Sequence, residues 1–114
     1  MRNHVFSKLK HAAQIGQAGD PRRHFRLGAV GIRKDGKTVS ARNSPTPHRN
    51  PKAHAEARLA RKLTPDSIVF VSRNLHNGDS AMSKPCKSCQ RILKSVGVKK
   101  VYYTTDYGFE VMSL

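Results

Sequence analysis

A histidine, a glutamate and a pair of cysteines are the residues of this sequence whose types and spacing could do chemistry. His54 and Glu56 stand two positions apart, and Cys86 and Cys89 form a C-x-x-C pair further along. One imidazole and two thiolates suit zinc, and three protein ligands leave the fourth tetrahedral position open to water, as in catalytic zinc sites. Glu56 lies only two positions after His54, so its carboxylate could reach a water bound at such a site. Its carboxylate could therefore move protons to and from the water.

The cysteine pair alone admits other interpretations. A C-x-x-C pair also occurs in redox enzymes and in halves of zinc fingers, and two thiols can simply lie in a core. A thioredoxin-like site is disfavoured because the usual aromatic and Gly-Pro neighbours are missing, and two cysteines cannot make a four-cysteine site. The N-terminus lacks an apolar signal segment, so the pair indicates metal or redox chemistry rather than a disulfide framework. We therefore expect a cytoplasmic protein.

Length and charge set the remaining bounds. The 114 residues, 37% of them hydrophobic, predict one domain over residues 1–114, and no apolar run is long enough to span a membrane. Lys and Arg number 22 against 7 Asp and Glu, which gives a net charge of +15 (22 − 7). Most of this excess precedes His54, and it predicts a polyanionic partner such as nucleic acid. The alternative is a basic surface that serves only solubility.

The apolar pattern predicts a mixed order of helices and strands. In chain order we expect a helix, two strands, a helix, a strand, a helix and two strands, over 4–16, 25–34, 37–42, 51–63, 68–71, 85–96, 98–104 and 109–112. Gly16 and Gly19 are expected to end the first helix, and small residues in 25–34 predict close packing against another backbone. The continuous apolar run 68–71 predicts a central strand buried on both faces. This order indicates an α/β sandwich of two or three layers around one mixed sheet.

The sequence His54-Ala55-Glu56, followed by Pro85-Cys86-Lys87-Ser88-Cys89, resembles the H-x-E and P-C-x-x-C signature of the zinc-dependent cytidine and deoxycytidylate deaminases. This resemblance covers nearly the whole chain and implies a cytidine deaminase-like α-β-α sandwich. It implies a hydrolytic deaminase that holds one zinc ion per chain through His54, Cys86 and Cys89. Glu56 would take the proton of the water, protonate the ring nitrogen of cytosine and assist the departure of ammonia.

The same resemblance implies contacts with the substrate. Asn43 would bind the sugar, the amide of Ala55 the carbonyl of the base, and the backbone carbonyl at Lys84 the amino group. The family often has Ser, Thr or Glu before the proline, and the Glu-Pro-Cys form typical of tRNA adenosine deaminases is absent, which favours cytosine over adenine. Tyr107, in a turn that borders the pocket in family members, could stack on a base. Asn43 as a plain turn residue and Tyr107 as a plain hairpin-tip residue are the competing interpretations.

Three hypotheses for the substrate follow. The first is cytosine in single-stranded DNA or RNA, with phosphates held by basic residues of the loops, namely Arg22, Arg23, Arg26, Arg42, Arg49 and Lys52. The second is a free cytosine compound such as cytidine, deoxycytidine or deoxycytidylate, which the short chain and its predicted C-terminal hairpin favour. The third, a non-catalytic nucleic-acid-binding zinc module, is disfavoured because binding alone does not need Glu56 beside an open zinc position. The sequence leaves the oligomeric state open.

Overall fold

The computed structural model describes residues 2–17, 25–42, 55–75 and 80–114. Its helices are α1 (Arg2–Gln17), α2 (Ala55–Ala60) and α3 (Lys87–Val96), and its strands are β1 (Phe25–Ile32), β2 (Thr38–Arg42), β3 (Ile68–Leu75), β4 (Ser80–Ala81), β5 (Lys100–Thr105) and β6 (Gly108–Ser113). The predicted order is confirmed, with the short β4 added where a loop was expected. No helix in these ranges has the length and apolar character needed to cross a membrane.

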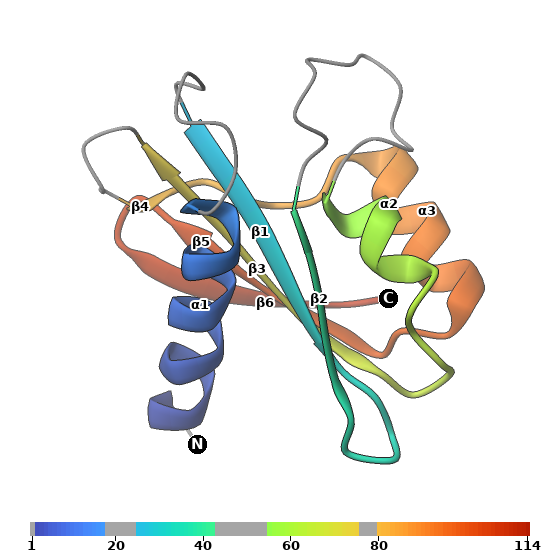
Figure 1. Ribbon diagram of the computed structural model, residues 1–114. Coiled ribbons are helices and arrows are strands. Elements are labelled where there is room, and N and C mark those ends of the chain that lie inside the picture. Colours follow the sequence, from blue (N-terminus) through green and yellow to red (C-terminus); the bar gives the residue numbers. More distant parts are fainter. Residues whose placement is uncertain (1, 18–24, 43–54, 76–79) are drawn as a thin grey trace.

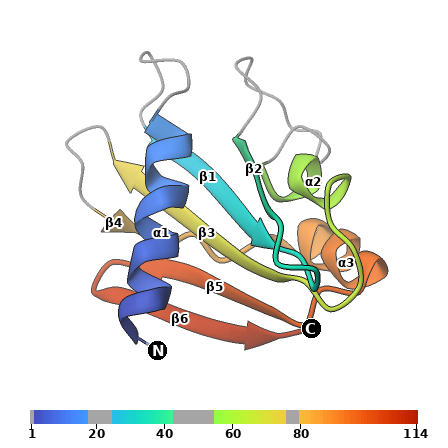
Figure 2. The ribbon, with the colours of Figure 1, turned by 60° about the horizontal axis from the view of Figure 1, so that its bottom comes forward.

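The strands form one mixed sheet, as predicted. Its order is β2-β1-β3-β5-β6, and β4 pairs with the end of β3 (Figures 1 and 2). Only the pairing of β3 with β5 is parallel among the described strands, and the other pairings are antiparallel. Parallel neighbours need a crossover connection, and here that connection contains α3. After β3 the chain therefore passes through α3 and returns to the start of β5, so that β3 and β5 run in the same direction.

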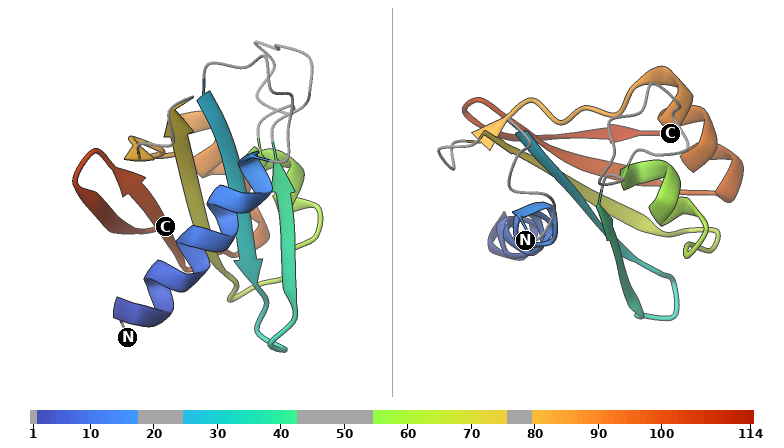
Figure 3. Two further views of the ribbon diagram at one scale, coloured as in Figure 1. Left: turned by 60° about the vertical axis from the view of Figure 1, so that its left-hand side comes forward. Right: turned by 45° about the horizontal axis from the view of Figure 1, so that its top comes forward.

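Helices cover both faces of the sheet, which makes the fold an α-β-α sandwich (Figure 3). On one face, Phe70 of β3 packs with Val5 and Leu9 of α1. On the other face, Val69 and Val71 belong to the core that β3 shares with α2 and α3. Successive side chains of a strand point to opposite faces, so the apolar run in β3 is buried on both sides, as predicted.

Close packing of α1 on β1 depends on Gly28. A Cβ atom at this position would collide with the carbonyl oxygen of Ala12 and the amide nitrogen of Gly16 in α1. The expected backbone-to-backbone contact is confirmed. The helix was expected to end at Gly16 and Gly19, and it ends at Gln17, one residue beyond the predicted bound. Gly16 itself lies within α1 and is buried where the helix meets the strand, and Gly19 lies outside the described residues.

The second helix ends earlier than predicted. It ends at Ala60 because the amide of Lys62 donates to Leu59 O at 2.8 Å and that of Leu63 to Ala60 O at 3.2 Å, which closes a tighter turn. The end of α3 agrees with the prediction. Gly97 takes the left-handed conformation (φ 97°), and the chain turns there toward β5.

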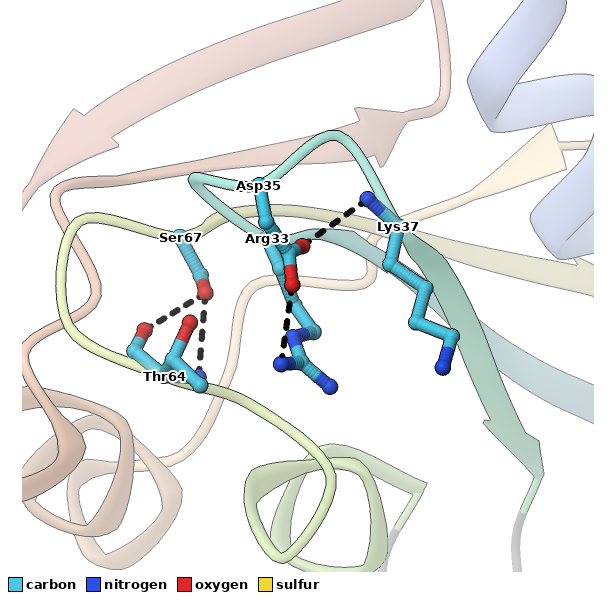
Figure 4. A network of polar contacts seen from close by, with 5 residues as sticks. All are labelled: Arg33, Asp35, Lys37, Thr64 and Ser67. Atoms are coloured by element: carbon cyan, nitrogen blue, oxygen red, sulfur yellow. Dashed lines mark hydrogen bonds and ion pairs between the residues drawn. The ribbon is translucent and has the colours of Figure 1, made fainter.

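The turn between β1 and β2 is stabilised by local polar contacts (Figure 4). The Asp35 carboxylate accepts from the Lys37 amide at 3.0 Å and forms an ion pair with Arg33 at 3.0 Å. In the neighbouring turn, the Ser67 hydroxyl donates to the Thr64 carbonyl oxygen and accepts from the Thr64 amide. These contacts stabilise the turn at which β2 begins. The other end of β2 lies near α2.

Candidate active site

The start of α2 carries Glu56 into the protein interior. Within the described chain the helix begins at Ala55, and both residues are buried, Glu56 with only 3% of its surface exposed. Leu59 and Ala60 belong to the same core as Ala55 and hold the helix against the sheet. Packing therefore fixes the position of the Glu56 carboxyl group. Within the described part of α2, no cation lies on the same face of the helix.

The two cysteines lie at the start of α3, beside α2. Cys86 is the extended residue before the helix (φ −66°, ψ 163°), and Cys89 lies in its first turn. Both are free thiols, Cys86 exposed and Cys89 fully buried, and a hydrogen bond joins them. The turn of chain between them therefore presents both sulfurs at one place, with one side open to the surface.

Glu56 and Cys89 meet through a hydrogen bond between their side chains. Burial raises the pKa of Glu56, and hydrogen bonds from its own backbone and from the Cys89 thiol lower that pKa only in part. Burial likewise raises the pKa of Cys89, and the nearby charge of Glu56 and the contact with Cys86 raise it further. Burial thus disfavours the charged form of each group, and a cation close by would offset that effect.

This cluster fits a zinc ion. No described residue donates a hydrogen bond to the buried Oε1 atom of Glu56, which leaves a polar atom without a protein partner. Thiolates are soft ligands that zinc binds readily, and its charge would offset the burial of the thiolates. His54, the third predicted ligand, lies outside the described residues, immediately before Ala55. The described residues alone therefore hold no set of three ligands.

A buried pair of hydroxyl groups supports the segment that leads to Cys86. Ser83 Oγ donates to Val71 O at 2.9 Å and accepts from the Thr104 amide at 2.7 Å. Thr104 Oγ1 donates to Ala81 O at 2.8 Å and accepts from the Arg73 amide at 3.1 Å. The segment after β4 is thereby attached to the ends of β3 and β5.

Sequence reasoning missed this role of Ser83 and Thr104. The two residues stand 21 positions apart, and neither occurs in a local motif that indicates the contact. The one available signal is a pair of hydroxyl residues at predicted strand ends, which is too common to single them out.

The carbonyl groups on either side of Pro85 differ in their partners. The Pro85 carbonyl accepts a hydrogen bond from Gln90 Nε2 at 2.8 Å. The Lys84 carbonyl receives none from any residue in the described ranges. An acceptor is therefore left for a bound molecule at the position where a contact with the substrate amino group was predicted.

The other predicted site residues are less well placed by the structure. Arg42 and Lys84 are exposed, and Tyr107, in the turn between β5 and β6, is 99% exposed. Its stacking role stays a prediction. Arg26 belongs to β1, but its side chain is outside the described part. The remaining predicted contacts also lie outside the described residues: Asn43, Arg22, Arg23, Arg49 and Lys52.

Comparison with known proteins agrees with this arrangement. Residues 3–105 match the family described as "Cytidine and deoxycytidylate deaminase zinc-binding region". The structure of cytidine deaminase from Mycobacterium leprae is similar, with 22% identity, a TM-score of 0.61 and coverage of 93% of this chain and 91% of that one. Cytidine deaminase from Mycobacterium tuberculosis gives 18% identity, a TM-score of 0.59 and coverage of 92% and 87%. A search of curated proteins gives no match.

Proposed function

Because the chain belongs to the cytidine and deoxycytidylate deaminase family and is thus a hydrolytic deaminase of cytosine compounds, we propose that it acts on cytosine within single-stranded DNA or RNA. His54, Cys86 and Cys89 would hold one zinc ion per chain. When bound, zinc supplies Lewis-acid activation of water. The family explains the chemistry, and the proposal concerns the residues that perform it and the size of the substrate.

Glu56 is the residue that would move the protons. It takes a proton from the attacking water and delivers it to the ring nitrogen beside C4 of cytosine. The water oxygen bonds to C4, the C4–N4 bond breaks, and a further proton passes through Glu56 to the departing amine. Cytosine and water thus give uracil and ammonia. Burial raises the pKa of the Glu56 carboxyl, which makes its carboxylate a stronger base toward the attacking water.

The groups proposed to hold the base are mainly backbone groups. The amide of Ala55 would donate to the base carbonyl, and the carbonyl of Lys84, which has no donor among the described residues, would accept from the amino group that leaves. Hydrogen bonds to both edges of the base distinguish cytosine from uracil, which carries an oxygen where cytosine carries the amine. Asn43 would bind the sugar. In this scheme the Lys84 side chain does not contact the base. A lysine at a position where the family often has Ser, Thr or Glu therefore leaves the contact through the backbone carbonyl intact.

The observation that carries the polynucleotide proposal is the charge of the chain. A net charge of +15 on 114 residues is far more than one small substrate requires. Proteins that bind nucleic acid gain much of their affinity when Lys and Arg neutralise phosphates and release counterions. The excess of cations therefore supports a substrate that carries many phosphates.

A free cytosine nucleoside or nucleotide is the second candidate. It is supported by the likeness in fold to the mycobacterial proteins, which are named cytidine deaminases and align over most of their length. Several basic residues could in that case bind the phosphate of deoxycytidylate. The two candidates share the same cytosine chemistry and differ in what surrounds the base.

A direct assay separates the two candidates. Zinc-loaded protein is incubated with cytidine, deoxycytidine, deoxycytidylate, a single-stranded DNA and a single-stranded RNA, and products are measured by mass spectrometry. Exchange of the amine for a carbonyl adds about one mass unit. Conversion of the oligonucleotides at higher kcat/KM than the monomers is the expected result. Conversion of monomers alone would refute the polynucleotide proposal and leave the deaminase chemistry in place.

A further inference from the structure

A basic pocket lies between β2 and the exposed side of α2. Its volume is about 400 Å³, and its charged lining consists of Arg42, Arg58, Arg61 and Lys62. Ser40 and Ala41 of β2 and Ile15 of α1 complete the wall. Among the described residues, four cations and no carboxylate thus line one concave surface. Figure 1 shows this meeting of the end of β2 with α2.

The charges of this pocket are not balanced within the described part of the chain. The ion pairs found there join Arg33 to Asp35, and Lys34 and Lys99 to Asp66. None of them includes a residue of the pocket, whose four cationic side chains are all exposed. Like charges gathered in one hollow repel one another, and a bound anion would relieve that repulsion.

Two of the cations are held in place by the strand. Arg58 Nη1 donates to the carbonyl oxygen of Arg42 at 2.8 Å, and Lys62 Nζ donates to that of Ser40 at 2.6 Å. A guanidinium has five N–H donors and an ammonium has three, so most of their donors remain for a ligand. Side chains that are already ordered lose less conformational entropy when they bind.

The pocket adjoins the proposed active site at the end of β2. Arg42 is the last residue of β2 and immediately precedes Asn43, the predicted sugar contact. Arg58 follows Glu56 by two residues, which places their side chains about 200° apart around α2. Glu56 is accordingly buried and Arg58 exposed. Glu56 and Arg58 thus lie on opposite sides of α2, and a strand of nucleic acid whose cytosine reaches Glu56 would come nearest the pocket at the end of β2, beside Arg42.

The geometry points to this pocket as a binding site for a backbone phosphodiester of the single-stranded nucleic acid, an inference that rests on the proposed function. Guanidinium groups suit phosphate because their N–H donors match the spacing of the phosphate oxygens. Their positive charge is opposite to that of the phosphate, so the hydrogen bonds are charge-assisted. Contacts of this kind position the strand without reading its sequence. The pocket would therefore raise affinity for any single strand, whatever its bases.

The test compares two variants with the same loss of charge. The pocket variant is Arg58→Gln with Arg61→Gln, and the control is Lys94→Gln with Lys100→Gln, two exposed positions outside the pocket. Binding of the zinc-loaded proteins to a labelled oligothymidine is measured by fluorescence anisotropy at several salt concentrations. Oligothymidine cannot be deaminated, so this readout is independent of the reaction.

We expect the pocket variant to lose affinity about tenfold at low salt, as for loss of charge-assisted hydrogen bonds. The slope of log K against log salt should become shallower by about 0.7 for each phosphate contact removed. The control should change both values much less. Equal losses in the two variants, or no binding of oligothymidine by the unsubstituted protein, would overturn the assignment of the pocket.

A further variant and the deamination assay separate the remaining explanations. Arg61→Gln alone leaves the contacts of Arg58 and Lys62 with β2 in place, so a loss of affinity in this variant cannot come from a disturbed strand. If oligothymidine binding depends on the pocket while only monomers are deaminated, the polynucleotide function fails and the pocket assignment stands. If oligonucleotides are deaminated and the pocket variants bind like the control, the pocket assignment fails alone.

Discussion

The carboxyl group of Glu56 is hydrogen-bonded to the thiol of Cys89, although the two residues belong to different helices. The contact joins the first turn of α2 to the first turn of α3. Between these helices the chain forms β3 and β4, so the sheet determines whether the two side chains meet. The proposed proton carrier and a proposed metal ligand are thus fixed relative to each other by the fold, before any metal or substrate binds.

Replacing Glu56 with glutamine should remove catalysis and leave zinc binding intact. The amide has nearly the size of the carboxyl but cannot accept and return a proton, so kcat should fall by about 10²- to 10⁴-fold. The measurements are steady-state kinetics on cytosine substrates and zinc content by elemental analysis. Asp106→Asn, at an exposed carboxylate in the turn between β5 and β6, serves as the control and should keep full activity. Undiminished activity of Glu56→Gln would refute the mechanism.

The stability of the metal-free protein should fall as pH rises. The pKa of Glu56 is raised by burial above its ordinary value of 4.5, so the folded protein holds this proton more tightly than the unfolded chain does. Below pH 4.5 both states are protonated, and no cost arises. As pH rises through the folded-state pKa, the unfolded carboxyl ionises first, and the free energy of unfolding decreases.

Glu56→Gln should abolish this part of the pH dependence, because glutamine does not ionise. Urea unfolding of both metal-free proteins between pH 4.5 and pH 8 provides the measurement. Parallel curves for the two proteins over this range would contradict a raised pKa at Glu56.

Removal of zinc should destabilise the protein, and loss of either cysteine should reproduce the effect. Zinc at a hundred times its Kd would stabilise the folded state by about 2.7 kcal/mol, which a chelator should reverse. Cys86→Ser and Cys89→Ser should each bind less zinc and lose activity, since a serine hydroxyl is a poor ligand at neutral pH. Cys89→Ser should also be less stable without metal, because Cys89 is fully buried and Cys86 is exposed. A zinc-free protein with a Cys86–Cys89 disulfide would instead support the redox interpretation.

Thr104→Val should impair both stability and catalysis. Valine keeps the shape of the side chain but leaves the Ala81 carbonyl and the Arg73 amide without the hydroxyl that pairs with them, at a cost of about 1–3 kcal/mol. Because the same hydroxyl holds the segment before Cys86, kcat/KM should fall by more than the unfolded fraction explains. Thr104→Ser retains the hydroxyl and should restore both properties. Failure of serine to restore activity would mean that the methyl group, rather than the hydrogen bonds, matters at this position.

Much of the fold was predictable because local patterns in this chain agree with its tertiary structure. The apolar run in β3 indicated burial on both faces, and Phe70 and Val71 do pack on opposite sides of the sheet. The stop at Gly97 was also found, since a left-handed residue is needed there. The close approach of Gly16 to β1 was not predicted, because a glycine that ends a helix and one that lets a strand approach look the same in sequence.

The candidate site was predictable only in part. Its chemical groups stand in short motifs, so Glu56, Cys86 and Cys89 could be selected and expected to lie at helix starts. Contacts between residues that are distant in sequence, which support the site, could not be found in this way. Ser83 and Thr104 meet across 21 positions, and the pairing of β3 with both β4 and β5 brings them together. The basic pocket likewise combines residues of β2 with residues of α2, and most of its cations were not selected from sequence.

The bonds from Arg58 and Lys62 to β2 have a consequence for association between copies of the chain. β2 is an edge strand of the sheet, and edge strands can pair with a neighbouring molecule and begin aggregation. The carbonyl groups of Ser40 and Arg42 already accept hydrogen bonds, and the positive charges that donate them repel an identical strand. Pairing between copies of the chain along β2 is therefore disfavoured.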